Sequence, residues 1–362
     1  MKWPCPVLIV LLAVLVGGCG GPPQARDRGW APPEFGVQFH GTWTDYDDAE
    51  REMVLDALVA HGVTTVRIDV SWRMLEPERS GTFDEYGLEV VDNAIQMAAD
   101  RNLRPLVTLW MAPEWANGSG DERVPPTSAA GLAGLEDVAS RLAIRYRGVV
   151  DAWEVWNEPN DDDFMTGADP EQYADLLSAA YHGFKEGDPN STVVFGGTSY
   201  IDVEWIRRAL AAGAAGHFDV MGVHPYLRPS DAPPGLPDDG SPWRLHRLPA
   251  LVTAMAAFGD GGKPIWFTEF GWCVHPNTPQ TPVWDRGVSI NEQAAYAAET
   301  IDIVRSTYPM VTRVYWYRAR AESPDPERAG YGLVYPDGQV APALSQMPDV
   351  LSGGEGGSAS AS

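Results

Sequence analysis

Two glutamates, Glu158 and Glu269, close apolar segments that are otherwise rich in aromatic residues. The first segment reads DAWEVWNEP and the second PIWFTEFGW. Two carboxyl groups about 5–5.5 Å apart can cleave a glycosidic bond with retention of configuration, because one attacks the anomeric carbon while the other protonates the leaving oxygen and then activates water. The two glutamates lie far apart in sequence, so this chemistry depends on a fold that brings the two segments together.

Eight short apolar segments alternate with stretches of helical periodicity. Asp169 and Pro170 form an N-cap followed by proline at the first helical position, and Ser289 with Glu292 has the spacing of a capping box. The alternation predicts parallel β/α units, and eight units predict a single (β/α)8 TIM barrel over residues 34–350. A doubly wound open sheet remains an alternative, because strand counting does not show closure. The predicted strands are residues 35–40, 64–72, 104–110, 151–159, 192–199, 219–226, 264–272 and 311–318.

Polar and aromatic side chains gather where these strands end. In a (β/α)8 barrel, reactive residues lie at the carboxyl ends of the strands and in the loops that follow. The strand ends supply three candidates for binding a sugar, which are His40, Trp110 and Trp272. Three more aromatic residues fit sugar contacts and ordinary packing equally well, namely Trp43, Trp115 and Tyr200.

The sequence around the two glutamates resembles that of clan A glycoside hydrolases. WEVWNEPN (Trp153–Asn160) resembles the acid/base strand of the clan, and WFTEFGW (Trp266–Trp272) resembles its nucleophile strand. VRIDVSW, GVHPY and YWYR are similar to its second, sixth and eighth strands. The stretch DPEQYADLLSAAYHGFKEGDPNSTVVFGG looks like the β-xylosidase/α-L-iduronidase family (family 39), and the cellulase family (family 5) shares the Asn-Glu-Pro core. The resemblance runs from Phe35 to Leu344.

This resemblance implies roles for individual residues. Glu158 matches the acid/base, Glu269 matches the nucleophile, and Asn157 matches the residue that hydrogen-bonds the sugar 2-hydroxyl. Arg67 matches an arginine beside the nucleophile, where a guanidinium favours the ionised carboxylate and lowers its pKa. Glu158 must instead begin protonated, so its surroundings should raise its pKa.

Three further residues take supporting roles under the same resemblance. Tyr226 is expected to donate a hydrogen bond to Glu269, and His224 is expected to bind substrate or to orient Glu158. Trp316 matches the aromatic platform under the sugar at the catalytic subsite, where a flat ring suits the apolar face of a pyranose.

Plainer explanations exist for two of these residues. Arg67 could pair only with Asp69 or Glu154 in a buried network inside the barrel. Glu154 itself lies about 13 Å deeper along its strand than Glu158, at ~3.3 Å per residue, and is interpreted as structural. His224 could be a hydrogen-bonded histidine of the core.

The composition narrows the partners and cofactors. The chain has 26 basic and 50 acidic residues, with a net charge of -24, which argues against a nucleic-acid partner because phosphate binding needs a basic surface. The aspartates at 161–163 are interpreted as a solvated loop rather than a metal site, because no turn pattern or further ligand accompanies them. Catalysis by two carboxyl groups needs no cofactor, so neither a cofactor nor a metal is expected.

The leading hypothesis is a retaining hydrolase that cleaves β-glycosidic bonds in an oligo- or polysaccharide through a glycosyl-enzyme intermediate. A transglycosylase would use the same carboxylates and differ in the access of water to the acceptor site. A surface lipoprotein that binds carbohydrate without cutting it is a third alternative. The sequence does not name the sugar, its linkage or the choice between internal and terminal cleavage.

The two ends of the chain have the composition of segments outside the barrel. An apolar run from Val7 to Val16 follows Lys2, so residues 1–18 are predicted to be a signal peptide. VGGC resembles a bacterial lipobox, which implies a lipid on Cys19 and a flexible tether over residues 19–33. Residues 351–362 are predicted to be a disordered tail. We therefore expect an extracytoplasmic monomer that is lipid-anchored or secreted and touches the membrane only through Cys19.

Overall fold

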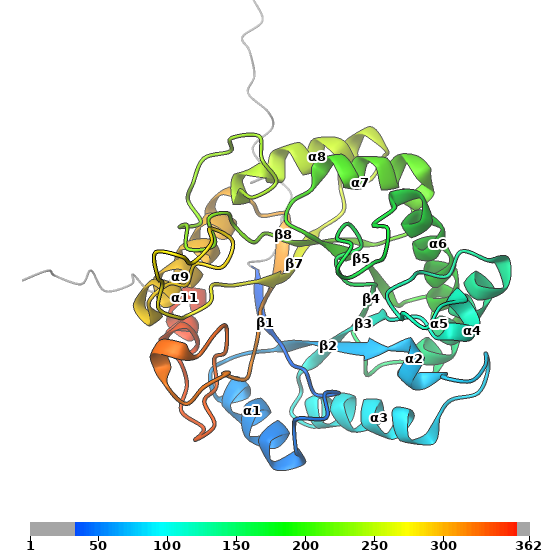
Figure 1. Ribbon diagram of the computed structural model, residues 1–362, viewed down its shortest axis with the longest axis horizontal. Coiled ribbons are helices and arrows are strands. Elements are labelled where there is room, and N and C mark those ends of the chain that lie inside the picture. The colour runs from blue at the N-terminus through cyan, green and yellow to red at the C-terminus, as the bar shows by residue number, and fades with distance from the viewer. Residues whose placement is uncertain (1–32, 353–362) are drawn as a thin grey trace, which may run out of the picture.

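The computed structural model describes residues 33–352, and its centre is a closed barrel of eight parallel strands (Figure 1). Each strand pairs with its neighbours in chain order, and β1 pairs with β8 to close the ring. This confirms the single (β/α)8 barrel and rules out the open doubly wound sheet. The strands are β1 (Glu34–Gln38), β2 (Thr65–Ser71), β3 (Arg104–Trp110), β4 (Ala152–Val155), β5 (Thr192–Ser199), β6 (Val220–His224), β7 (Ile265–Phe270) and β8 (Val311–Trp316).

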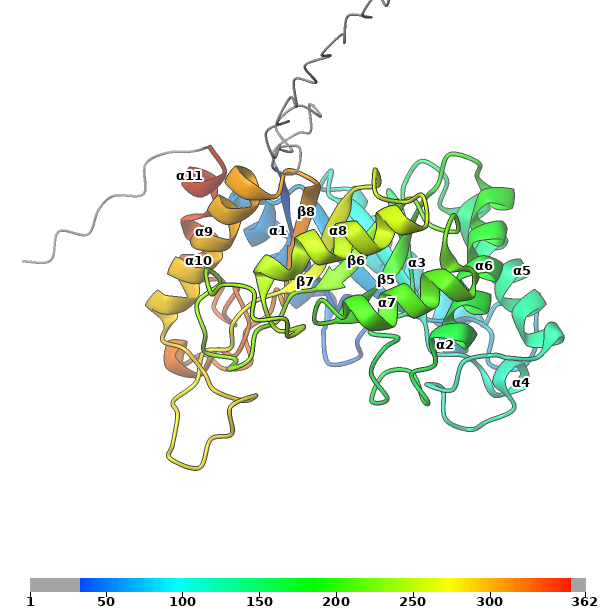
Figure 2. The same cartoon turned by 90° about the horizontal axis from the view of Figure 1, so that it is seen from above.

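Helices surround the barrel in the view of Figure 1, and they also cover the strands when the molecule is turned by 90° (Figure 2). The predicted N-caps are confirmed: the Asp169 side chain accepts from the backbone N–H of Glu171, and Ser289 and Glu292 form a capping box. The helices are α1 (Asp48–Ala60), α2 (Trp72–Leu75), α3 (Glu85–Ala99), α4 (Glu114–Asn117), α5 (Ala129–Arg145), α6 (Pro170–Gly187), α7 (Val203–Ala209), α8 (Leu248–Ala257), α9 (Ile290–Thr307), α10 (Pro342–Ser345) and α11 (Met347–Ser352).

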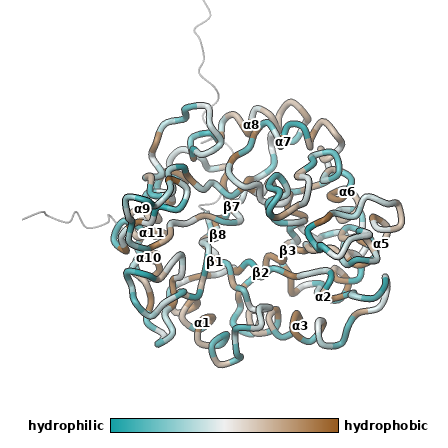
Figure 3. The backbone as a smooth tube through the Cα atoms, viewed as in Figure 1, coloured by the Kyte–Doolittle hydropathy of each residue, from teal (hydrophilic) through white to brown (hydrophobic). Residues whose placement is uncertain are grey.

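The core has two parts, one between the barrel and the helices and one inside the barrel. Hydrophobic and hydrophilic stretches alternate along the helices (Figure 3), as expected where one face packs on the strands and the other meets solvent. Inside the barrel, the floor is a separate apolar cluster made of Leu106, Ala152, Val194, Val220, Trp266 and Tyr315. A Cβ at Gly36 would lie 2.5 Å from the Tyr315 ring, so β1 needs glycine at that level.

The predicted strand at 151–159 is shorter in the structure, where β4 ends at Val155. Trp156 has φ 69° and Glu158 has φ 42°, a region that side chains other than glycine rarely adopt. The chain therefore turns out of the sheet just before the predicted acid/base. Such strained positions persist where the surrounding structure holds them, and they cluster at active sites.

No helix within residues 33–352 has the length and apolar character needed to cross a bilayer. The predicted signal peptide, Cys19 and nearly all of the tether lie outside the described residues. α11 continues to Ser352, so it includes the first two residues that were assigned to the tail. The remainder of that tail also lies outside the described residues.

Candidate active site

A cavity of about 320 Å³ opens at the carboxyl ends of the strands. Its lining is a mixture of charged, amide and aromatic side chains: Gln38, His40, Trp43, Arg67, Asp69, Trp110, Asn157, Glu158, Phe164, Tyr226, Glu269, Tyr317 and Tyr331. A larger groove of about 1150 Å³ runs over the outside of the barrel between α1 and α3 and contains none of the predicted site residues. The cavity at the strand ends is therefore the candidate active site.

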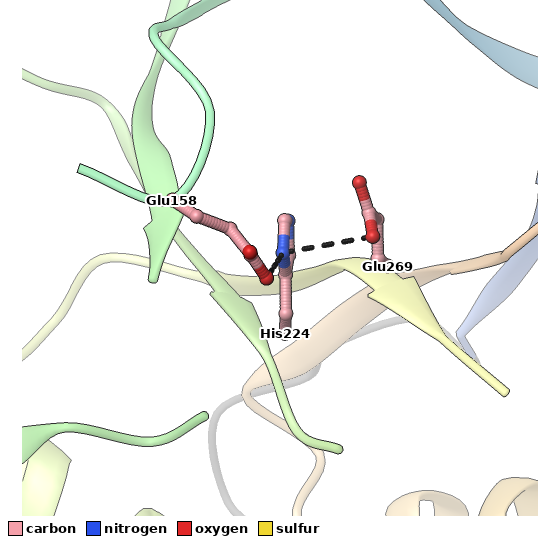
Figure 4. Close-up of side chains that lie close together, drawn as sticks. All are labelled: Glu158, His224 and Glu269. Atoms are coloured by element: carbon pink, nitrogen blue, oxygen red, sulfur yellow. Dashed lines mark hydrogen bonds and ion pairs between the residues drawn. The ribbon is translucent and has the colours of Figure 1, made fainter. Parts of the chain in front are cut away.

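Glu158 and Glu269 face each other across this cavity with His224 between them (Figure 4). Nδ1 of His224 lies 2.8 Å from Oε1 of Glu158 and 3.7 Å from Oε2 of Glu269. One carboxyl oxygen of each glutamate lies within 4.8 Å of the other. The barrel thus brings together the two carboxyl groups that the sequence analysis paired.

The surroundings of Glu158 favour its neutral form. Burial, reinforced by the negative charge of Asp161, raises the pKa of Glu158 to about 8. Burial also lowers the pKa of His224 to about 4, so the imidazole beside Glu158 is neutral at neutral pH. A carboxyl group that keeps its proton at neutral pH is suited to act as a general acid.

Glu269 has the opposite environment, with donors on both of its oxygens. Nη1 of Arg67 donates to Oε1 over 2.6 Å, and the Tyr226 hydroxyl donates to Oε2 over 2.9 Å. Hydrogen bonds to the charged form of a carboxyl group favour that form. Arg67 and Tyr226 therefore fix the Glu269 carboxyl group in place where it lines the cavity.

Arg67 is the centre of a buried network, with 2% of its surface exposed. Its Nε donates to Glu154 over 2.7 Å, and its Nη2 donates to Oδ1 of Asn157 over 2.7 Å. The structure thus combines both interpretations of Arg67, because it pairs with Glu154 inside the barrel and with Glu269 at the cavity. The amide of Asn157 is oriented with its oxygen toward Arg67, which leaves Nδ2 as its donor.

Glu154 is fully buried beneath the cavity, as its position along the strand suggested. Besides Arg67, it accepts a hydrogen bond from the Thr108 hydroxyl over 2.6 Å and one from the Gly197 backbone N–H over 3.0 Å. The Arg67 guanidinium, helped by the Thr108 hydroxyl, holds the pKa of Glu154 below its usual value against the effect of burial. Glu154 therefore anchors Arg67 and does not face the cavity.

Trp316 and Trp272 are placed differently from what the sequence analysis expected. Trp316 is fully buried, its indole N–H donates to the carbonyl of Tyr331 over 2.7 Å, and its ring packs on Phe270. Trp272 is 5% exposed and donates to the carbonyl of Ala232. Neither residue lines the cavity, so their prediction as sugar contacts is corrected.

The physical reason is the alternation of side chains along a strand. Tyr315 points into the barrel floor, so Trp316 points outward to the helices and Tyr317 points back to the cavity. Tyr317, directly after β8, is thus the aromatic residue of this segment that lines the cavity. The same alternation puts Asp69 on the inner face of β2 with Arg67, and Asp69, predicted as a possible partner of Arg67 inside the barrel, lines the cavity.

Several other lining residues were not predicted from the sequence. Gln38 precedes the predicted His40 by two residues on β1, so the period of the strand could have identified it. Phe164 and Tyr331 come from loops, where no such period exists. His40 and Trp110, which were predicted, do line the cavity, and so does Trp43.

Glu158, His224 and Glu269 also offer three donor atoms close enough together to hold a metal ion. A cation there would occupy both carboxyl groups and would displace the proton of Glu158. The donor set is therefore shared by two mutually exclusive uses, metal binding and acid/base chemistry.

A family model described as cellulase (glycosyl hydrolase family 5) matches residues 30–296. The chain belongs to glycosyl hydrolase family 5. The match covers most of the barrel, from β1 into α9. It includes both glutamates of the candidate site.

Individual proteins are similar at lower identity. Endo-1,4-beta-xylanase C of Phanerodontia chrysosporium is 25% identical over 266 residues, which are 68% of this chain and 60% of that protein. A family 39 glycoside hydrolase from Bacteroides cellulosilyticus WH2 superposes with a TM-score of 0.68 at 23% identity, over 89% of this chain and 64% of the other. GH5_18 from Streptomyces cattleya, solved with GlcNAc, has a TM-score of 0.64 at 20% identity, over 91% and 82%.

These matches have two consequences. The structural likenesses, at 23% and 20% identity, support the barrel fold. The chain spans about 60% of the length of the xylanase it matches and 64% of the family 39 enzyme.

Proposed function

We propose that this protein is a retaining glycoside hydrolase that cleaves β-glycosidic bonds in an oligo- or polysaccharide. The observation that carries the proposal is the pair formed by Glu158 and Glu269. Their carboxyl oxygens approach within 4.8 Å, burial keeps Glu158 protonated, and Glu269 accepts hydrogen bonds from Arg67 and Tyr226. A separation of this size fits the retaining mechanism, because an inverting pair needs about 6.5–9.5 Å to admit water between the carboxyl groups.

In the first step, a carboxylate oxygen of Glu269 attacks the anomeric carbon of the sugar. The bond to the leaving oxygen breaks, and Glu158 transfers its proton to that oxygen. The products are a glycosyl ester on Glu269, a free leaving group and an ionised Glu158. Positive charge develops on the sugar during this step, and the acidic cavity stabilises it.

In the second step, Glu158 acts as a base. It removes a proton from a water molecule, the water oxygen bonds to the anomeric carbon, and the ester bond to Glu269 breaks. Both carboxyl groups return to their starting protonation states. Two inversions at the same carbon give a product with the original configuration.

The hydrogen-bond donors around the cavity suit these two reaction steps. Arg67 and Tyr226 hold Glu269 in place for the attack, and Nδ2 of Asn157 can donate to a hydroxyl of the bound sugar. The β configuration of the bond is supported by the matched xylanase, whose name specifies a β-1,4 linkage. A transglycosylase would follow the same first step and differ only in using a sugar hydroxyl in place of water.

The test replaces each carboxyl group with alanine and supplies azide as an external nucleophile. With Glu269→Ala, we expect turnover of an activated aryl β-glycoside to fall by about 10⁴-fold. Azide then enters the vacated face and gives the α-glycosyl azide. With Glu158→Ala, the ester still forms, so azide gives the β-glycosyl azide instead. Identical products from the two variants would overturn the assignment of roles.

The competing function is carbohydrate binding without cleavage. A wild-type protein that binds glycans yet leaves a broad panel of aryl β-glycosides intact would establish that alternative. To separate hydrolysis from transglycosylation, the fraction of glycosyl groups transferred to water and to added sugar acceptors is measured with the wild-type enzyme.

We also propose that the protein is extracytoplasmic and anchored by a lipid on Cys19. The support is the order of Lys2, the apolar run and the small residues before that cysteine. In cells that express the full chain, Cys19→Ser should abolish incorporation of labelled palmitate and release the protein from the membrane fraction. Unchanged labelling and fractionation would contradict the anchor.

A further inference from the structure

Asp69 is a third carboxylate in the cavity, and the mechanism above does not use it. It lies on β2 two residues beyond Arg67, which places it roughly 7 Å nearer the mouth. Its Oδ1 accepts from Nδ1 of His40 over 3.0 Å and from Nε2 of Gln38 over 3.3 Å. Its Oδ2 accepts from the Trp43 indole N–H over 3.0 Å.

These donors keep Asp69 ionised. Burial alone would raise its pKa, but the hydrogen bonds from His40 and Trp43 hold the pKa below its usual value. An ionised carboxyl group accepts hydrogen bonds and donates none. A ligand that touches Asp69 must therefore supply hydroxyl or N–H groups.

Negative charge is in excess around the cavity. Asp69 and Glu269 both line it, and Glu154 lies directly beneath. Arg67 is the one arginine or lysine among the lining residues, and its three nitrogens already donate to protein acceptors. Even with Glu158 neutral, one guanidinium stands against three carboxylates.

Histidine does not supply the missing cation. His40 lines the cavity, but its Nδ1 is used by Asp69 and its Nε2 is enclosed by protein atoms. His224 is neutral at neutral pH because burial lowers its pKa to about 4. A carboxylate on a bound sugar would thus meet repulsion and find no free arginine or lysine among the residues that line the cavity.

The aromatic wall beside Asp69 is arranged for a sugar ring. Trp43 stacks on His40 with 3.9 Å between ring centroids, and Tyr317 meets His40 edge-on at 5.6 Å. The hydrogen bond from the Trp43 indole to Asp69 fixes the orientation of this exposed ring. Flat apolar surface next to an acceptor is the combination that a pyranose with free hydroxyls requires.

We infer that the cavity selects a neutral sugar as the unit that becomes bound to Glu269, and that Asp69 is the residue that rejects uronic acids and accepts hydrogen bonds from sugar hydroxyls. This inference rests on the proposed function and adds the substrate class. The two substrate classes to be compared are neutral glycosides and glycuronides. A glycuronide carries a carboxylate at the carbon outside the ring, where the neutral sugar carries a hydroxymethyl group.

The test uses matched pairs of 4-nitrophenyl substrates, the β-glucoside with the β-glucuronide and the β-galactoside with the β-galacturonide. Each pair shares the leaving group and differs only in the charge of the sugar. We expect the wild-type kcat/KM to favour the neutral member by about 100-fold or more, since like charges in a desolvated site repel strongly.

Asp69→Asn removes the charge while keeping the size of the side chain. This variant should lose activity on the neutral member and reduce the preference by about tenfold or more. Asp163→Asn is the matched control, because Asp163 is an exposed carboxylate on a loop at the same end of the barrel. It removes the same charge from the surface and should leave the preference unchanged. An equal effect of the two substitutions, or wild-type turnover of a glycuronide within about tenfold of its partner, would overturn the inference.

Binding to the Glu158→Gln variant gives a readout that does not require turnover. Calorimetry should detect neutral xylo-, cello- or manno-oligosaccharides and no β-1,4-linked oligoglucuronide, which is the charged counterpart of the cello-oligosaccharide. If the acidic oligosaccharide alone binds, the inference is wrong even where cleavage is demonstrated. If neutral oligosaccharides bind and the wild type cleaves nothing, the proposed function fails while the selectivity stands.

Discussion

At the scale of single residues, the protein gives its two cavity glutamates very different neighbours. Glu158 is buried beside a neutral histidine and near the charge of Asp161, whereas Glu269 receives hydrogen bonds from Arg67 and Tyr226. These different surroundings support the proposed roles, with Glu158 as the acid and Glu269 as the nucleophile. The roles therefore follow from the surroundings and not from the residue type.

The first prediction concerns the pH dependence of activity. The proton on Glu158 is needed for cleavage and its pKa is about 8, so kcat/KM should fall as pH rises through about 8. The fall should be steep for a 4-nitrophenyl glycoside and for substrates with poorer leaving groups. It should be weak for a 2,4-dinitrophenyl glycoside, whose leaving group departs without protonation. A basic limb of equal steepness for both substrates would point to a different titrating group.

The second prediction concerns stability. The folded-state pKa of Glu158 lies above its unfolded value of 4.5, so the folded chain holds a proton that the unfolded chain releases. The stabilisation that comes from this retained proton is fully present below pH 4.5 and is lost as the pH rises to about 8. Glu158→Gln does not titrate, so it should become progressively more stable than the wild type over this window, by up to about 1.4 kcal/mol per pH unit.

Urea unfolding of both proteins near pH 5 and again near pH 7.5 measures this difference. Glu52→Gln on α1 serves as the control, because Glu52 is exposed and its substitution should show no such divergence. Parallel curves for wild type and Glu158→Gln at the two pH values would contradict the raised pKa.

The sequence identified most of the charged residues of the site and fewer of its aromatic ones. Glu158, Glu269 and Arg67 stand in segments whose pattern is distinctive, and the structure brings them together. Trp316 was predicted from its match to the platform residue of the resembled clan, but the alternation along β8 decides which ring faces the cavity. Phe164 reaches the cavity from a loop, where no periodic pattern fixes the direction of a side chain.

At the scale of the elements, small irregularities in the strands position the reactive groups. β5 shifts register against β6 between Phe195 and Thr198, and β7 shifts against β8 between Phe267 and Phe270. The eight strands and their order were predictable from the apolar segments. The bulges were not, because a one-residue shift leaves no mark on the pattern of apolar residues.

Gly197 lies in the irregular part of β5 and carries the third prediction. A Cβ there would lie 2.2 Å from Nε2 of His224 and 2.3 Å from Oγ1 of Thr268, and both side chains are fully buried. Gly197→Ala must therefore displace His224 from Glu158. We expect kcat/KM to fall by about 100-fold or more, with a loss of roughly 2–4 kcal/mol in the free energy of unfolding.

Gly262→Ala is the matched control, because a Cβ at Gly262 meets no atom within 4 Å. Both the activity and the denaturation midpoint of this variant should stay close to the wild type. If Gly197→Ala keeps wild-type kinetics, the contact between β5 and His224 does not position the acid/base.

At the scale of the whole molecule, the two ends of the barrel serve different purposes. The mouth concentrates acidic groups around the cavity, where they serve chemistry and selectivity. The opposite end is tied by ion pairs between strands. Glu34 on β1 contacts Nη2 of Arg104 on β3 over 2.6 Å and Nε of Arg313 on β8 over 2.8 Å, and Arg313 also pairs with Asp151 before β4.

This second network crosses the seam where β1 meets β8, so its loss should weaken the closure of the barrel without reaching the site. Glu34→Gln removes the charge shared by two arginines that are partly buried, and we expect a loss of about 1–2 kcal/mol in the free energy of unfolding. Six residues of extended chain, roughly 20 Å, separate Glu34 from His40, so kcat/KM should not change. Added salt should narrow the difference from the wild type, because the arginines are accessible enough to be screened. If Glu34→Gln lowers kcat/KM and leaves the stability unchanged, the ion pairs at the seam affect the geometry of the cavity. The division between a catalytic end and a stabilising end of the barrel would then be wrong.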